Sequence, residues 1–146
     1  MEAKSLITPI GNFNSFYVNS LLIKLSYIEQ KHSSYLPDIS LQKIINNFFS
    51  AEGLKNFPKY SLQGTPFQLK LWNTLLKIPR GHTVSYSSLA SMIGSLEAAR
   101  AVGTACRLNP LPLLIPCHRV IKQDGSTGDY ALGKVNKEYL LKMEST

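Results

Sequence analysis

The sequence predicts an α/β chain of the α+β kind, in which a small N-terminal α/β lobe precedes a mostly helical C-terminal domain with a helix-turn-helix. Aromatic and β-branched residues concentrate in residues 12–28, whereas helical apolar spacing recurs from residue 65 onward. The 146 residues, of which 44% are apolar, suffice for one ordinary domain or two small ones. We expect two, with residues 1–61 as the N-terminal lobe and residues 62–146 as the C-terminal domain.

The N-terminal lobe is expected to combine strands with one helix. Residues 12–28 favour strands and are interrupted by Asn and Ser, which predicts one or two strands. Asp38-Ile39-Ser40 begins a helical pattern that ends near Gly53. Its expected apolar face consists of Leu41, Ile44, Ile45 and Phe48. This lobe carries no recognisable chemical motif.

The C-terminal domain opens with a helix whose first turn is clearly marked. Thr65 is a capping residue, Pro66 occupies the first helical position and Gln68 the third. The expected apolar face consists of Leu69, Trp72, Leu75 and Leu76. Pro79-Arg80-Gly81 is expected to end the helix, because Pro and Gly both disfavour helical backbone.

Two shorter helices follow and are joined by a tight turn. The first is expected over residues 85–93, ended by Gly94, and the second over residues 96–108, capped by Ser95 and ended by Asn109-Pro110. A helix pair with such a turn is typical of a helix-turn-helix. The second helix is rich in small residues, which are Ala98, Ala99, Ala101, Gly103, Thr104 and Ala105.

Arg100 and Arg107 lie seven positions apart on this second helix and therefore share one face. A slim helix with an isolated arginine suits the narrow minor groove of DNA. The net charge is +7, with ten basic against five acidic residues in 62–146, and this excess suits a polyanionic partner. The alternative is a helix packed closely in the core, with both arginines solvated.

The composition argues against several classes of protein. Two cysteines, Cys106 and Cys117, are too few for a secreted disulfide scaffold. No signal-peptide pattern and no apolar run of membrane-spanning length is found, so we expect no membrane association and a cytoplasmic location. The cysteines and the three histidines, His32, His82 and His118, show no metal-ligand spacing, so no zinc or other metal site is expected.

The candidate reactive segment is Pro116-Cys117-His118-Arg119, which follows the short apolar run 111–115. A catalytic thiol needs help to become a thiolate. His118 is adjacent, but neighbours in an extended chain point to opposite faces, so proton transfer needs either a turn or one relaying water. An inert, buried structural cysteine is the alternative.

The histidine in turn needs an orienting carboxylate. The last predicted helix, residues 134–144, offers Glu138 and Glu144. Its expected apolar stripe consists of Val135, Tyr139, Leu140 and Met143. Glu144 lies somewhat nearer that stripe, and an acidic residue in a final turn opposes the helix dipole, so helix stability does not explain it. These two points favour Glu144, and a solvated C-terminal glutamate is the alternative.

Together these segments resemble the O6-alkylguanine-DNA alkyltransferase family. The matching motifs, in order, are Val84-Ser85-Tyr86, Arg100-Ala101-Val102-Gly103, Asn109-Pro110, residues 114–120, Gly128-Asp129-Tyr130 and Glu144. They agree in order and spacing over residues 62–146. The first 60 residues look like a short, divergent version of the family's variable N-terminal lobe.

The resemblance implies a DNA-repair methyltransferase that acts once, without cofactor, on double-stranded DNA containing O6-alkylguanine, and that is expected to be a monomer. Cys117 would accept the alkyl group, with His118 as its base through water and Glu144 orienting the histidine. Asn109 would tie the hinge before the thiol, Tyr86 would protonate the departing guanine, and Arg100 would fill the gap in the base stack. The implied DNA-binding residues are Arg100, Arg107, Tyr86, Ala99 and Gly103, and the implied pocket residues are Val120, Tyr130, Ala131, Pro112 and Cys106.

Two positions depart from the family pattern, and alternative functions stay open. Leu132 stands where some members have glycine, and Cys106 stands where a larger apolar residue is frequent. The first alternative is a non-catalytic alkyl-lesion-binding protein of the same fold, against which Cys117 argues. The second alternative is a cysteine hydrolase, in which Cys and His come from distant segments. The third is a structural DNA-binding module with an inert Cys117.

Overall fold

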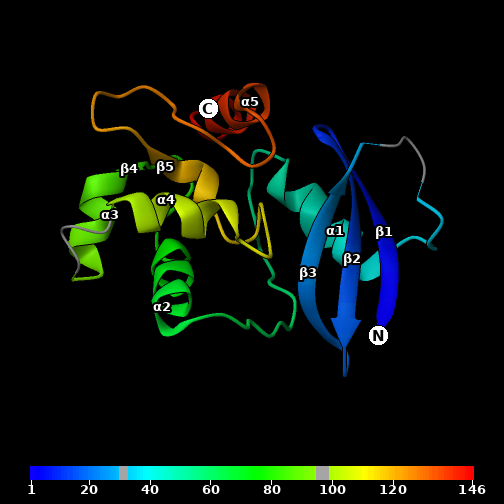
Figure 1. The fold of residues 1–146 in the computed structure, drawn as a ribbon. Helices are drawn as coiled ribbons and strands as arrows, with labels where there is room; N and C mark the ends of the chain where they lie inside the picture. Colours follow the sequence, from blue (N-terminus) through cyan, green and yellow to red (C-terminus); the bar gives the residue numbers. More distant parts are fainter. Residues whose placement is uncertain (30–32, 95–98) are drawn as a thin grey trace. The chain divides into compact units, whose positions relative to one another are not determined.

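The computed structural model describes residues 1–29, 33–94 and 99–146. It contains both helices and strands, which confirms the mixed α/β class (Figure 1). The chain divides into two compact units, Met1–Gln63 and Gly64–Thr146, and each is described by itself. No helix in the described part of the chain is long and apolar enough to cross a membrane.

The first unit is a three-stranded antiparallel sheet with one helix. Strands β1 (Glu2–Thr8), β2 (Gly11–Val18) and β3 (Leu21–Ile28) lie in the order β1-β2-β3. Sequence reasoning placed strands only within residues 12–28 and missed β1, whose side chains do not alternate clearly. Asn19 and Ser20 both have positive φ (51° and 66°), the conformation of a tight hairpin turn between β2 and β3.

Helix α1 (Ile39–Phe48) begins at a buried cap, Asp38. The Asp38 carboxylate accepts hydrogen bonds from the Leu41 amide (3.1 Å) and from the hydroxyls of Ser15 and Tyr17, which both lie on β2. The cap therefore also ties the helix to the sheet. The predicted apolar face is confirmed: Leu41, Ile45 and Phe48 are buried, and Ile44 is half-buried.

The second unit begins with α2 (Pro66–Leu75), whose predicted capping box is confirmed. The Thr65 hydroxyl accepts from the Gln68 amide (3.1 Å), and the Gln68 side chain accepts from the Thr65 amide (3.0 Å). The buried face differs from the prediction. Leu71 is buried together with Trp72 and Leu75, whereas Leu69 and Leu76 are only half-buried. Tertiary packing selects this face.

Helices α3 (Tyr86–Met92) and α4 (Ala99–Arg107) pack against each other, and α4 also contacts α2 through a hydrogen bond from the Trp72 indole to the Ala105 carbonyl (3.0 Å). Ser85 caps α3 by accepting from the Ser88 amide. The expected cap Ser95 and the first positions of the second helix, residues 96–98, lie outside the described residues.

Two short strands and the last helix complete the second unit. Strand β4 (Val84–Ser85) pairs in parallel with β5 (Val120–Ile121), which brings the Tyr86 segment beside the Cys117 segment. Helix α5 spans Lys134–Glu144.

The apolar stripe expected on α5 is confirmed only in part. Leu140 is buried and Met143 is half-buried, but Val135 and Tyr139 are 80% and 46% exposed. The other buried residues of the helix are Lys137 and Glu144. A hydrophobic pattern cannot identify this face, because it buries two charged side chains that are stabilised by partners from distant segments.

Candidate active site

Cys117 sits at a turn rather than in an extended chain. It opens a short 3₁₀ turn, Cys117–Arg119, directly after Pro116, whose φ of −82° and ψ of 62° form an inverse γ-turn. The Cys117 amide donates to the Ile115 carbonyl across that turn (2.8 Å). Upstream, buried Leu113 has a φ of 75°, a left-handed conformation that costs a branched side chain roughly 1–2 kcal/mol. The surrounding packing must hold this segment in place.

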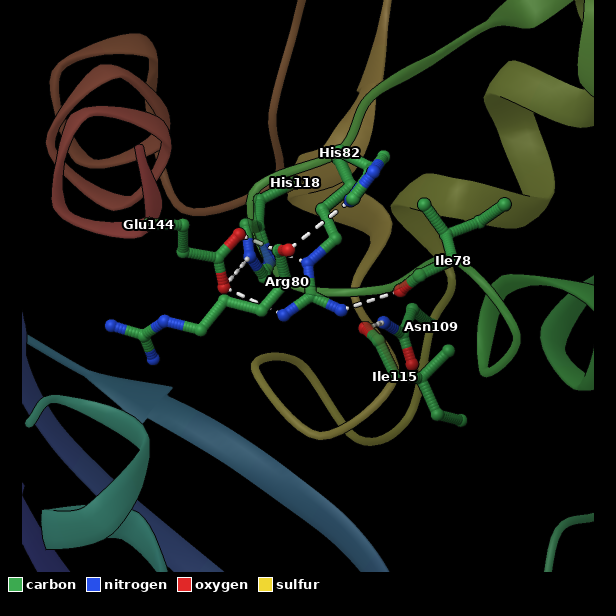
Figure 2. A network of polar contacts seen from close by, with 8 residues as sticks. Ile78, Arg80, His82, Asn109, Ile115, His118 and Glu144 are labelled. Atoms are coloured by element: carbon green, nitrogen blue, oxygen red, sulfur yellow. Dashed lines mark hydrogen bonds and ion pairs between the residues drawn. The ribbon is translucent and has the colours of Figure 1, made fainter. Parts of the chain in front are cut away.

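Asn109 fixes the thiol from the end of α4. Its side-chain Nδ2 donates to the Cys117 sulfur (3.2 Å) and to the Ile115 carbonyl (2.8 Å), while its Oδ1 accepts from the Leu111 amide (2.9 Å). Figure 2 shows the Asn109 amide facing Ile115. The Asn109 side-chain amide thus holds residues 111–117 together through hydrogen bonds. Its N–H donates to the sulfur, and this hydrogen bond favours the thiolate form of Cys117.

His118 meets Glu144, as the sequence reasoning preferred. The His118 Nε2 lies 3.0 Å from a Glu144 carboxylate oxygen, and both side chains are buried (Figure 2). Burial lowers the pKa of His118, although the contact with Glu144 acts in the opposite direction. The imidazole is therefore disposed to be neutral, which is the form that can take a proton. Glu138, the rejected carboxylate, is exposed on the same helix.

Arg119 shares the same carboxylate. Its guanidinium donates from Nε to one Glu144 oxygen (2.9 Å) and from Nη2 to the other (2.7 Å), and Nη1 donates to the Ile78 carbonyl (2.7 Å). Burial alone would raise the pKa of Glu144, but hydrogen bonds from Arg119 and His118 outweigh it and hold the pKa at about 2. Glu144 is thus ionised at neutral pH, and it anchors α5 to the reactive turn.

Lys137 is a second charged residue on the buried face of α5, and sequence reasoning missed it. Its side chain is fully buried, and its Nζ donates to the carbonyls of Val120 (2.6 Å) and Asp129 (3.1 Å) and to the Tyr86 hydroxyl (3.5 Å). One signal could have found it. Lys137 lies seven residues before Glu144, which is two helical turns, so the two residues share a face.

Two opposing influences act on the thiol. Burial raises the pKa of Cys117, and the Asn109 hydrogen bond and the positive charge of Lys137 lower it. Helix α5 therefore contributes a lysine whose positive charge acts on the thiol and a carboxylate that contacts the histidine. The charge of Lys137 and the Asn109 hydrogen bond therefore offset part of the rise in the Cys117 pKa that burial causes.

Replacing Lys137 with methionine is expected to slow the reaction of Cys117 with iodoacetamide several-fold near neutral pH and to move its pH profile to higher pH. The reason is that the buried cation no longer opposes the rise in the thiol pKa. Lys142→Met on the exposed side of α5 is the control with the same loss of charge. Identical pH profiles for the two variants would show that Lys137 acts only in packing.

A small cavity adjoins the sulfur. It has a volume of about 10 Å³ and is lined by Tyr86, Gly103, Cys106, Arg107, Cys117, Asp129, Tyr130 and Ala131. Three predicted pocket residues, Cys106, Tyr130 and Ala131, thus line the same cavity as the thiol. Of the described residues, Val120 and Pro112 lie outside this lining; both are buried, and the Val120 carbonyl is bound by Lys137.

Tyr86 is suited to keep its proton in this cavity. Burial, and to a smaller extent negative charge on Cys106 and Cys117, raises the pKa of Tyr86 to about 12. A neutral phenol held beside the thiol can donate a proton to a group that leaves from the cavity.

A wider, positively charged groove of about 480 Å³ adjoins the cavity. The groove is lined by Tyr86, Ala99, Arg100, Gly103, Thr104, Arg107, Lys122 and Asp129. All five residues predicted for DNA contact lie in this lining. Four lining residues belong to both spaces, so the groove lies next to the cavity that the thiol lines. Among the described residues, no group of three or more His, Cys, Asp or Glu side chains gathers as a metal site.

The chain resembles DNA-repair methyltransferases in sequence. Residues 66–146 match the family model described as the 6-O-methylguanine DNA methyltransferase, DNA binding domain. A methylated-DNA–protein-cysteine methyltransferase of Methanosarcina acetivorans is 45% identical over 100 residues, which cover 68% of this chain and 64% of that protein. The protein of the same name from Mycobacterium tuberculosis is 34% identical over 151 residues, covering 98% of this chain and 92% of that protein.

The fold agrees with this resemblance. The crystal structure of Mycobacterium tuberculosis OGT in complex with DNA matches with a TM-score of 0.89 and 35% identity, covering 99% of this chain and 93% of that chain. In the sequence comparisons, this chain spans just under two thirds of the length of the Methanosarcina relative and nearly all of the length of the mycobacterial relative. The family model and these relatives together show that the chain belongs to the methylated-DNA–protein-cysteine methyltransferase family.

Proposed function

We propose that this protein repairs DNA by moving the alkyl group from O6 of guanine to Cys117 in a single, irreversible turnover. One observation carries the proposal: a buried thiol, held by Asn109, lines a small cavity that shares four residues with a positively charged groove. In this proposal residues 62–146 bind DNA and perform the transfer, and residues 1–61 form an accessory lobe. The protein acts as a monomer in the cytoplasm.

The transfer exchanges one bond for another. The Cys117 sulfur attacks the alkyl carbon, so a C–S bond forms as the C–O bond to guanine breaks. The thiol proton passes through a water to His118, whose ring Glu144 orients. Tyr86 donates its proton to the departing guanine and regains one from solvent. Since no group in the site can hydrolyse a thioether, each molecule reacts once.

The DNA-binding step uses the helix pair. We propose that α3 and α4 form a helix-turn-helix whose second helix enters the minor groove, where the small residues Ala99 and Gly103 allow a close approach. The lesion lies inside the duplex, so its nucleotide must be extruded at a cost of a few kcal/mol. Arg100, exposed on α4, would fill the vacated stack and offset part of this cost.

The proposal is tested by mixing the protein with a duplex oligonucleotide that contains O6-methylguanine and measuring the mass of the protein. We expect the mass of one methyl group to be gained and peptide mapping to place it on Cys117. A protein that binds the lesion but gains no mass would instead be the non-catalytic lesion-binding alternative. A methyl group on Cys106 would contradict the assigned acceptor.

Methylation of Cys117 is expected to lower the stability of the second unit. The cavity beside the sulfur holds only about 10 Å³, and adding a methyl group to a packed site costs roughly 1–3 kcal/mol. For a domain of this size the melting temperature should fall by roughly 4 °C or more. Thermal unfolding of unreacted and methylated protein, followed by the fluorescence of Trp72, measures the difference. An unchanged melting temperature would show that the pocket has room for the product.

A further inference from the structure

The groove above the thiol has two rims from different parts of the second unit. One rim belongs to α4 and carries Arg100 and Arg107, for which the proposed function already gives a role. The other rim belongs to the loop after β5 and carries Lys122 and Asp129. Lys122 is exposed, takes no part in the proposed transfer step, and lines the same groove as the two arginines.

The position of Lys122 is defined by its loop. Its amide donates to the Ser126 carbonyl (2.9 Å) and its carbonyl accepts from the Gly125 amide (3.0 Å), so the loop closes tightly on this residue. A Cβ added at Gly128, where φ is 73°, would lie 3.3 Å from the Tyr86 ring and 3.4 Å from the Lys122 Cγ. The stem of the lysine and the ring of Tyr86 therefore flank one glycine.

The charges of the groove suit a polyanion on both rims. Arg100 and Arg107 supply two cations on the helix, and Lys122 supplies one on the loop. Asp129 is the acidic residue of this lining, and its backbone carbonyl is engaged by Lys137. A lysine ammonium is a compact point charge that binds phosphate without demanding a fixed orientation.

We propose that Lys122 binds a backbone phosphate of the lesion strand next to the extruded nucleotide, on the side of that nucleotide opposite to α4. This inference rests on the proposed function. An extruded nucleotide remains linked to its strand through two flanking phosphates. With its base beside Tyr86 and the duplex on α4, one flanking phosphate must pass along the loop rim, where Lys122 is the cation.

The test compares Lys122→Gln with Lys134→Gln, which removes the same charge from an exposed lysine on α5 outside the groove lining. For Lys122→Gln we expect about fivefold weaker binding to a lesion duplex. The plot of log binding constant against log salt concentration should also become less steep by roughly 0.9, the contribution of one phosphate contact. Lys134→Gln should keep the parental slope. Transfer from free O6-benzylguanine should proceed at the parental rate in both variants, since no phosphate is present.

Neutral methylphosphonate linkages identify the phosphate. One such linkage is introduced at a time, on either side of the lesion, and each should weaken binding by the parent protein. At one of the two positions the linkage should not weaken binding by Lys122→Gln any further, because the linkage and the substitution remove the same contact. Equal slopes for both variants, or additive effects at both linkages, would overturn the assignment of Lys122. Failure of the parent protein to transfer any alkyl group would refute the proposed function instead, so the two failures are distinguishable.

Discussion

Replacing Cys117 with serine is expected to abolish alkyl transfer and to leave the affinity for duplex DNA nearly unchanged. A serine hydroxyl is a far weaker nucleophile than a thiol at neutral pH, because it holds its proton much more tightly. Affinity should instead come from phosphate contacts and from Arg100 in the groove. Cys117 is only 4% exposed and offers little surface to the DNA.

The serine is also expected to be tolerated by the fold. It is nearly isosteric with cysteine, and the Asn109 Nδ2 that lies 3.2 Å from the sulfur can donate to the hydroxyl. Mass spectrometry measures the transfer, and fluorescence anisotropy with a labelled lesion duplex measures the binding. Cys106→Ser is the matched control and should still be methylated on Cys117. A parallel loss of binding in Cys117→Ser would mean that this residue is mainly structural.

Replacing Glu144 with glutamine is expected to reduce both the stability of the second unit and the reactivity of its thiol. The carboxylate binds Arg119 through two hydrogen bonds and lies 3.0 Å from His118, and all three side chains are buried. Removing one partner of a buried ion pair leaves an uncompensated charge, which costs about 3–5 kcal/mol. Without the anion, His118 is also a weaker acceptor for the thiol proton.

The pH dependence of stability gives a separate signature of Glu144. The pKa of its carboxyl is held at about 2, below the ordinary value of 4.5, so the ionised group stabilises the folded state above pH 4.5. This contribution is lost progressively as the pH falls from 4.5 through about 2. The parent protein should lose this stability on acidification, and Glu144→Gln should lack that component.

Urea unfolding followed by Trp72 fluorescence measures the effect, because the sole tryptophan lies in the second unit. Glu138→Gln, an exposed glutamate on the same helix, is the control and should change the stability by less than about 0.5 kcal/mol. A larger loss of thiol reactivity in Glu138→Gln than in Glu144→Gln would show that the wrong carboxylate has been assigned.

Local signals in the sequence predicted much of the fold. The capping box at Thr65 and Gln68 and the apolar face of α1 were both foreseen, because each depends on residues within about two turns of one helix. Strand β1 was not foreseen, because backbone pairing with other segments defines it. It pairs with β2 through a register from Glu2 with Tyr17 to Thr8 with Gly11, and Ser5 also exchanges backbone hydrogen bonds with Leu36 and Asp38. The β4–β5 pair was missed for the same reason: each strand has two residues and is defined by its partner.

For the candidate site, the sequence by itself determined which chemical groups are available: a thiol next to an imidazole, a nearby asparagine, and two carboxylates on the last helix. Only the tertiary structure decided how α5 faces them. The apolar spacing of that helix correctly pointed to Leu140 but also to Val135 and Tyr139, whereas Lys137 and Glu144 are buried in their place. The physical reason is that burial of a charge depends on its partners, and these come from distant segments: Arg119 and His118 for Glu144, and the carbonyls of Val120 and Asp129 for Lys137.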